Sequence, residues 1–190
     1  GESLAPGVST KLDRAIHSTE RLAGLIETLL DVSRLSTGQL TLKPERMELL
    51  ATVQDVTGRL QEAAAQADCP VVVREGPPLE GTWDRLRIEQ VISNLLSNAF
   101  KYAAGSPVAL SVSREGTEAV LVIHDKGPGI PEKDLHRLFK RFERAAPMKH
   151  YGGLGLGLYV TREIVQAHGG SISVENAAEG GARFTVRLPL

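Results

Sequence analysis

The chain has 190 residues, of which 42% are hydrophobic and 24% charged, and its formal net charge is −1. This composition is that of a soluble globular protein with room for one sizeable domain, and the charge balance gives no reason to expect nucleic acid as a partner. Cys69 is the single cysteine, which excludes a disulfide framework and a cysteine-based zinc site. No apolar run is long enough to span a bilayer. We therefore expect a cytoplasmic chain without membrane contact of its own, even if a longer parent protein is membrane-anchored.

The first predicted element is a long helix over roughly residues 11–36. Apolar residues recur there at helical spacing, and they form a face wider than the seam of a two-stranded coiled coil. These residues are Leu12, Ala15, Ile16, Leu22, Ala23, Leu25, Ile26, Leu29 and Leu30. One helix cannot bury such a stripe alone, so we expect it to pack with a partner in a helical bundle.

Shorter elements follow, and the hydrophobic pattern alternates between strand and helix periods. In chain order they are a short strand "QLTLKP" ended by Pro44, a helix over 48–68, a strand over 70–75, a loop marked by Pro77-Pro78 and Gly81, and a helix over 87–103. Two strands over 108–125 then form a hairpin, a helix covers 158–167, and a closing hairpin joins "SISVEN" to "ARFTVRLPL" across Gly180-Gly181. Helices that alternate with antiparallel hairpins predict an α/β protein, a two-layer sandwich of a mixed sheet packed on helices behind the long N-terminal helix.

The helix over 87–103 has a polar edge that a core helix does not need. Asn94, Asn98 and Lys101 fall within about 60° of one another, because successive residues turn by about 100°. Two amide oxygens one turn apart can reach the same Mg²⁺, and a lysine one turn further can offset phosphate charge. A solvated helix face explains the same residues equally well when this helix is taken alone.

Two glycine clusters follow. "DKGPGI" puts Asp125 at a strand end, where a carboxylate can accept a hydrogen bond from an exocyclic amino group such as that of adenine, and Gly127 and Gly129 let a flat ligand approach the backbone. "GGLGLGL" opens a helix directly, which is a phosphate site in many proteins. It fits neither a Walker A loop nor the GxGxxG fingerprint. A capped tight turn is the alternative for the first cluster.

A basic stretch, "LHRLFKRFERAAPMKHY", separates the two clusters and includes Lys140, Arg141, Arg144 and Lys149. A basic segment that ends in glycines beside a phosphate site predicts a closing lid. A solvated charged surface remains the alternative for any single one of these residues.

In order, "NLLSNAFKYA", "DKGPGI", "LFKRFER" and "GGLGLGL" resemble the N, G1, F and G2 boxes of the ATP-binding catalytic domain of sensor histidine kinases, within the Bergerat-type group that includes gyrase B, Hsp90 and MutL. The resemblance spans roughly residues 39–190. In addition, "RLAGLIETLLDVSRLSTGQLTLKPE" resembles the second helix of the kinase dimerisation domain and its exit strand. The implied organisation is a dimerisation-helix remnant over residues 1–37 and an ATP-binding catalytic domain over residues 38–190.

The resemblance implies ATP and Mg²⁺ as ligands and assigns roles to matching residues. Asn94 and Asn98 would hold Mg²⁺, while Lys101 and Arg144 would contact the phosphates. Asn94, Lys101 and Arg144 are the implied catalytic residues, and Asp125 would bind the adenine amino group. The implied nucleotide-binding residues are Asn98, Tyr102, Asp125, Gly127, Gly129, Ile130, Gly153, Leu154, Gly155, Leu156, Gly157 and Leu158.

Two departures from the family pattern limit the expected activity. Lys126 stands where the G1 box commonly has Asn, and the phosphoacceptor motif is absent, since none of His17, His124, His136, His150 and His168 has the flanking residues of an acceptor. We therefore expect a histidine kinase fragment that donates the γ-phosphoryl of Mg-ATP to a histidine outside this chain and cannot autophosphorylate alone. Its expected partners are a dimerisation helix of the same parent protein and the receiver domain of a response regulator.

Two other hypotheses remain. The first is a degenerate nucleotide-sensing or scaffolding module without phosphoryl transfer, which Lys126 and the missing acceptor support. The second is a free-standing ATPase of the gyrase or Hsp90 kind. It fits poorly, because those proteins lack the "LLDVSRL" helix.

Overall fold

The computed structural model describes residues 41–143 and 154–190, together with a few helical positions near the N-terminus, which are Thr19, Gly24, Ile26, Leu29, Leu30, Val32 and Ser33. The chain divides into two units, Gly1–Leu40 and Thr41–Leu190. In the first unit Ile26, Leu29 and Leu30 are 51%, 49% and 52% exposed. The rest of the predicted long helix lies outside the described residues, so its bundle partner stays a prediction. Within the described part of the chain, no helix combines the length and the apolar character needed to cross a bilayer.

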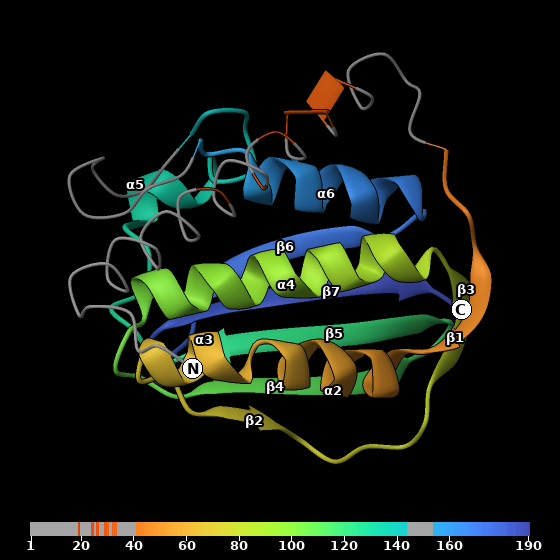
Figure 1. The fold of residues 1–190 in the computed structure, drawn as a ribbon, viewed down its shortest axis with the longest axis horizontal. Coiled ribbons are helices and arrows are strands. Elements are labelled where there is room, and N and C mark those ends of the chain that lie inside the picture. Colours follow the sequence, from red (N-terminus) through yellow and green to blue (C-terminus); the bar gives the residue numbers. More distant parts are fainter. Residues whose placement is uncertain are drawn as a thin grey trace, which may run out of the picture. The chain divides into compact units, whose positions relative to one another are not determined.

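The second unit has a layer of helices over one face of a mixed sheet (Figure 1). The main sheet has the order β2-β4-β5-β7-β6, with β2 parallel to β4 and the remaining pairs antiparallel. Its strands are β2 (Val71–Val73), β4 (Val108–Glu115), β5 (Glu118–Asp125), β6 (Ser171–Asn176) and β7 (Ala182–Pro189). The helices are α2 (Leu49–Arg59), α3 (Gln61–Gln66), α4 (Arg85–Tyr102), α5 (Glu132–Leu135) and α6 (Gly157–Ala167). The predicted α/β sandwich is confirmed.

The core lies between α4, α6, α2 and the sheet. The apolar positions of α4 recur at helical spacing and are buried, as the pattern predicts: Ile88, Val91, Ile92, Leu95, Leu96, Ala99 and Phe100. Alternate residues of β7 are buried in the same way, with Ala182, Phe184, Val186 and Leu188 on the inner face. One face of α4 is thus fixed against the sheet, which leaves its polar edge in a defined place.

Three local predictions were wrong. The strand expected before Pro44 instead follows it, as β1 (Glu45–Glu48), and pairs antiparallel with β3 (Glu80–Trp83) in a separate two-stranded sheet. The segment of β3 was expected to be a loop. The single helix expected over 48–68 is broken at Leu60, whose φ of −97° and ψ of 7° are not helical. Gly58 in the last turn of α2 is a weak helix former, so ending the helix at that turn costs little free energy.

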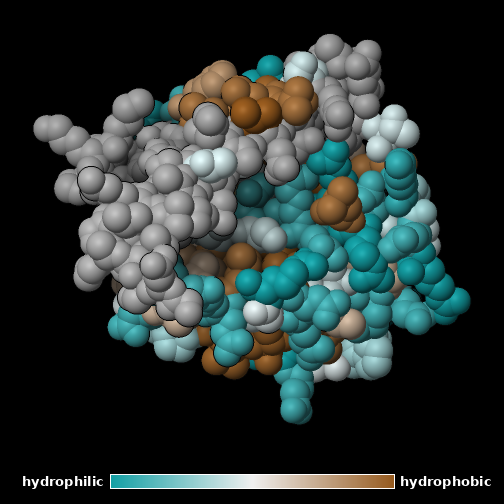
Figure 2. Space-filling model, in the orientation of Figure 1, coloured by the Kyte–Doolittle hydropathy of each residue, from teal (hydrophilic) through white to brown (hydrophobic). Residues whose placement is uncertain are grey.

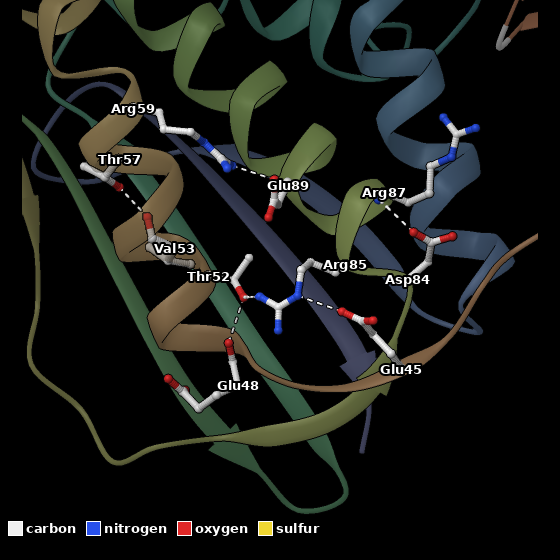
Figure 3. A network of polar contacts seen from close by, with 10 residues as sticks. All are labelled: Glu45, Glu48, Thr52, Val53, Thr57, Arg59, Asp84, Arg85, Arg87 and Glu89. Carbon is white, nitrogen blue, oxygen red and sulfur yellow. Dashed lines mark hydrogen bonds and ion pairs between the residues drawn. The ribbon is translucent and has the colours of Figure 1, made fainter.

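Polar contacts join β1, α2 and α4 on the helical side of the domain (Figure 3). Arg85 Nε lies 2.7 Å from Glu45 Oε1, and Arg59 Nη2 lies 2.5 Å from Glu89 Oε2. The arginines of both pairs are well exposed, so each pair contributes on the order of 0.5 kcal/mol. The Arg59–Glu89 pair joins α2 to α4 and the Arg85–Glu45 pair joins α4 to β1, and neither adds much to the stability of the domain.

Asp84 caps the start of α4 and ties it to two other elements. Its Oδ1 accepts from Arg87 N–H at 3.1 Å, and its Oδ2 accepts from Lys43 N–H at 2.8 Å. Its own N–H donates to Nε2 of His168 at 3.0 Å, while Nδ1 of His168 lies 2.8 Å from the carbonyl of Ile164. His168 is thereby fixed as a structural link between α4 and α6.

Candidate functional site

The polar edge of α4 lies next to the N-terminus of α6. Asn94 and Asn98 are half-buried, and Lys101 and Tyr102 are exposed. Asn94 Nδ2 donates to Oγ1 of Thr161 at 3.4 Å, and a Cβ added to Gly157 would lie 3.8 Å from Asn94 Oδ1. The surface is hollowed between α4 and α6, with hydrophilic residues along the hollow (Figure 2). The structure therefore brings Asn94 of the predicted N box next to Gly157 of the predicted G2 box.

Asp125 is the second centre of the site. It ends β5, is only 8% exposed, and its Oδ1 accepts from the N–H groups of Gly127 at 2.9 Å and Ala182 at 3.2 Å. Among the described residues no group donates to Oδ2. A buried carboxylate with one oxygen held by the backbone and one left as an acceptor suits a single incoming amino group.

The two glycines after Asp125 are required by close approaches. A Cβ on Gly127 would lie 2.6 Å from Cβ of Ala103, at the end of α4. Gly129 has a φ of +74°, and a Cβ there would lie 2.8 Å from Oδ1 of Asn176. The N–H and the carbonyl of the next residue, Ile130, are both bonded to the side chain of Asn176. The loop thus passes closely between α4 and the β6–β7 hairpin.

The predicted lid is described only in part, and Arg144 and Gly153 lie outside the described residues. Before the gap, Phe142 N–H donates to the carbonyl of Gly155 at 3.1 Å. Arg141 stacks on the ring of Tyr159 at 4.6 Å and donates to its hydroxyl at 2.6 Å. The described start of the predicted lid, at Arg141 and Phe142, is therefore held against α6 and the residues that precede it.

The G2-box residues after the gap occupy different environments. Gly155 has a φ of +70°, Leu154 is 39% exposed and Leu156 is 1% exposed. Gly157 and Leu158 are half-buried at the start of α6. Among residues 41–143 and 154–190 no side chain caps this helix, and N–H groups in the first turn of a helix suit an anion.

These residues fit a nucleotide and a divalent cation. In residues 41–143 and 154–190, no group of three His, Cys, Asp or Glu side chains could hold a metal ion. The amide oxygens of Asn94 and Asn98 are a donor set that suits Mg²⁺ when phosphates complete its shell. The backbone N–H groups at the α6 N-terminus are donors of the kind that suit a phosphate, and Oδ2 of Asp125 is an acceptor of the kind that suits a base.

Ionisable groups near Asp125 include one with a shifted pKa. The pKa of Glu179 is lowered from its ordinary 4.5, first by a hydrogen bond from its own backbone N–H and then by the charges of Arg183 and His124. His124 is buried beside Asp125, and its Nε2 lies 2.9 Å from the carbonyl of Gly180. Lys126 is exposed and its N–H donates to Pro107. The contact with the Gly180 carbonyl gives His124 a structural role.

Sequence reasoning missed several residues of this site. Thr161 is fully buried and bonded to Asn94, Asn176 holds Ile130, and Ala182 supplies an N–H to Asp125. Gly181 lies so close to β5 that a Cβ would be 1.8 Å from the carbonyl oxygen of Asp125. Only the Gly180-Gly181 pair carried a signal, and it predicts a turn without saying what the turn contacts.

Comparison with known families gives a match over residues 83–190 to the family described as histidine kinase-, DNA gyrase B- and HSP90-like ATPase. The match covers more than half of the chain and contains all the motifs described above. The chain belongs to this family. Its second unit is accordingly an ATP-binding domain of the histidine kinase type, which confirms the resemblance read from the four motifs.

Curated relatives are sensor kinases. The signal transduction histidine-protein kinase AfsQ2 of Streptomyces coelicolor is 37% identical over 190 residues, which is 100% of this chain and 34% of that protein. The circadian input-output histidine kinase CikA of Synechococcus elongatus is 35% identical over 93% of this chain and 24% of that protein. The ATPase-family chain thus spans about a third or less of these relatives.

Solved structures show the same fold. The Acinetobacter baumannii histidine kinase AdeS superposes with a TM-score of 0.77 at 28% identity, covering 99% of this chain and 86% of that one. The mycobacterial sensor histidine kinase MprB gives a TM-score of 0.67 at 28% identity, over 77% of this chain and 97% of that one.

Proposed function

We propose that this chain is the catalytic portion of a two-component sensor histidine kinase, and that it donates the γ-phosphoryl of Mg-ATP to a histidine outside the chain. The carrying observation is Asp125, a buried carboxylate with Oδ1 held by two backbone N–H groups and Oδ2 left as an acceptor. Family membership supports ATP as the ligand, and the polar edge of α4 supports Mg²⁺.

The residues divide the work as follows. Asp125 accepts a hydrogen bond from the adenine amino group, and Gly127, Gly129 and Ile130 form the wall beside the base. Asn94 and Asn98 supply amide oxygens to Mg²⁺, while Lys101 and Arg144 neutralise phosphate charge. Tyr102 and the G2-box residues, Gly153, Leu154, Gly155, Leu156, Gly157 and Leu158, complete the nucleotide site. Bound Mg-ATP supplies the phosphoryl group and a divalent charge, so the protein's own part is positioning and charge stabilisation.

Two protein partners follow from the same proposal. A dimerisation helix of the parent protein would present the histidine, and the receiver domain of a response regulator would take the phosphoryl group from it. The histidine kinase ThkA has been solved in complex with the response regulator TrrA, and it shares the fold at a TM-score of 0.72 and 19% identity. At that identity the likeness extends to the fold alone, so the regulator remains part of the proposal.

The test has two stages. Calorimetry of AMPPNP binding, with and without Mg²⁺, checks the nucleotide and metal assignments, and Asn98→Ala should remove most of the Mg²⁺ dependence. The second stage adds a helical hairpin with a phosphoacceptor histidine, together with labelled Mg-ATP, and measures phosphohistidine. Failure to bind AMPPNP would refute the proposal at its first step.

A nucleotide-sensing module without phosphoryl transfer is the second candidate. The observation in its favour is Lys126, which replaces the usual Asn of the G1 box and is exposed. Mg-AMPPNP binding together with no phosphohistidine, on several acceptor hairpins from relatives such as AfsQ2, would favour this candidate.

A further inference from the structure

The loop that follows Asp125 is held by the tip of the last hairpin. We name residues 125–130 the adenine loop and residues 176–182 the hairpin tip. The two segments contact each other at both ends of the loop, through Asp125 and through Ile130. The tip lies more than 45 residues further along the chain, as the separation of 46 between Ile130 and Asn176 shows.

Asn176 binds the far end of the adenine loop with both of its polar atoms. Its Oδ1 accepts from Ile130 N–H at 2.8 Å, and its Nδ2 donates to the Ile130 carbonyl at 2.7 Å. This pairing fixes the orientation of the Asn176 amide. If the amide were flipped, Nδ2 would face the Ile130 N–H and Oδ1 would face the Ile130 carbonyl, and neither bond could form. The Asn176 amide lies close against Gly129, whose φ of +74° only glycine adopts freely.

The hairpin tip also fixes the near end of the loop. Ala182 N–H donates to Oδ1 of Asp125 at 3.2 Å. Gly181 approaches the carbonyl of Asp125 so closely that no side chain fits between them. The tip itself is closed by hydrogen bonds from Ala177 N–H to Gly181 and from Gly180 N–H to Ala177. One rigid turn therefore determines where both ends of the loop lie.

Asn176 does more for the loop than for the stability of the domain. The residue is exposed, so its hydrogen bonds exchange readily with those of water, and each adds only a modest net stability. The two bonds instead restrict the position of Ile130, because they hold both its N–H and its carbonyl. Free of that restriction, the loop would have to be ordered again each time a base binds, at a cost in affinity.

We propose that Asn176 is a positioning residue for adenine recognition, which holds the adenine loop in the conformation that presents Asp125 and the Gly129 backbone to the base. This role rests on the proposed function, since it requires a nucleotide at Asp125. Asn176 does not bind the phosphates or the metal. Its removal therefore weakens recognition of the base and leaves recognition of the polyphosphate unchanged.

The experiment compares two ligands on the full chain. Displacement of a fluorescent ATP analogue gives dissociation constants for Mg-ATP and for Mg-tripolyphosphate, which lacks the base. Asn176→Ala should weaken Mg-ATP about tenfold, as expected for the loss of two hydrogen bonds, and change tripolyphosphate less than about twofold. Glu175→Gln is the matched control, because Glu175 is the exposed neighbour on β6 and pairs with Arg183 rather than with the loop.

Asn176→Asp adds a readout that general destabilisation would not produce. The aspartate keeps an acceptor for Ile130 N–H but sets a carboxylate oxygen against the Ile130 carbonyl, so its affinity for Mg-ATP should fall at pH 7. Protonation restores a donor there, and the neutral form is favoured by that hydrogen bond. The ratio of its dissociation constant to that of the unmodified chain should therefore shrink as the pH falls from 7 toward 5.

The outcomes are distinct. A selective loss for Mg-ATP in Asn176→Ala, with partial recovery of Asn176→Asp at low pH, supports the role. Equal losses for both ligands, or an unchanged affinity for Mg-ATP in both variants, overturn it. If the unmodified chain binds Mg-tripolyphosphate as tightly as Mg-ATP, or binds neither, the proposed function itself fails and the role of Asn176 fails with it.

Discussion

The two sides of the proposed site, the adenine side at Asp125 and the phosphate side at Asn94 and Asn98, are built differently. On the adenine side, Asp125 is 8% exposed and is bonded to two backbone N–H groups, one of them from β7. On the phosphate side, Asn94 and Asn98 are half-buried on a helix edge, and the contact from Asn94 to Thr161 is a long 3.4 Å. The sheet fixes one side, and two helices share the other.

Under the proposed function, the difference in structure follows from what each side would recognise. A base is flat and rigid, and one amino group distinguishes it, so a fixed acceptor gives selectivity. Phosphates and Mg²⁺ are held largely by electrostatic attraction. The energy of that attraction changes slowly with distance, so small displacements of the charged groups are tolerated. We therefore expect substitutions on the adenine side to have large effects and those on the phosphate side smaller ones.

The largest expected effect comes from the close approach of the hairpin tip. Gly181→Ala would set a Cβ 1.8 Å from the carbonyl oxygen of Asp125 at a φ of +80°. This clash should lower the free energy of unfolding by about 3 kcal/mol or more. Gly180→Ala is the matched control, because Gly180 has a φ of +94° but nothing within 4 Å of its Cβ, and should cost about 1 kcal/mol. Urea denaturation measures both, and equal losses would contradict the predicted contact.

Asp125→Asn should have the largest effect on binding. The change turns one oxygen into an amide donor that faces the donor of the base, so we expect about a 100-fold weaker affinity for Mg-AMPPNP. Calorimetry at a temperature well below unfolding measures this loss. Asp55→Asn, an exposed position on α2, is the control for the same chemical change. A loss of less than fivefold at Asp125 would remove the basis for calling the adenine side the fixed one.

A smaller effect is expected at Thr161 on the phosphate side. Thr161→Val keeps the shape but removes the hydroxyl that orients Asn94, and since that bond is long, the affinity for Mg-AMPPNP should fall only about threefold. Thr161→Ser, which keeps the hydroxyl, should bind like the unmodified chain. A drop as large as that of Asp125→Asn would show that the phosphate side is as tightly positioned as the adenine side.

The smallest effect concerns pH. The pKa of Glu179 is lowered, first by its own backbone N–H and further by Arg183 and His124. A carboxylate with a lowered pKa stabilises the fold above its ordinary pKa of 4.5, and this stabilisation is lost as the pH falls through the folded-state value. Glu179→Gln should therefore flatten the dependence of unfolding on pH slightly in the acid range. Urea midpoints between pH 3 and 6 measure the change, and an unaltered slope would contradict it.

Much of the fold is predictable from the sequence, because its signals are local. The apolar spacing of α4, with Ile92, Leu95 and Leu96, sets its buried face, and the alternation around Gly116 sets the β4–β5 hairpin. The short strand β3 was missed because it pairs only with β1, outside the main sheet, and Gly81 within it predicts a turn. Gly81 is in fact required for packing, since a Cβ there would lie 2.2 Å from the ring of Trp83.

The candidate site is predictable only as far as its motifs extend. Asp125, Asn94 and Gly157 belong to patterns that carry chemistry at fixed spacing. The structure places Gly157 next to Asn94, and it places Gly127 of the Asp125 loop against Ala103 at the end of α4. Asn176 and Thr161 carry no such pattern. Their roles depend on which strand lies beside which helix, and that information is in the tertiary pairing rather than in the spacing of neighbouring residues.

The strand order has a consequence for how the domain is made in a cell. β7 lies between β5 and β6, and its residues 182–189 also supply the N–H of Ala182 to Asp125 and the Pro189 carbonyl to Trp83. Until a ribosome has added the residues of β7, β5 has an open edge, and such edges invite pairing with other chains. Asp125 therefore gains its N–H donor from Ala182 only after β7, the strand that fills the place between β5 and β6, has emerged.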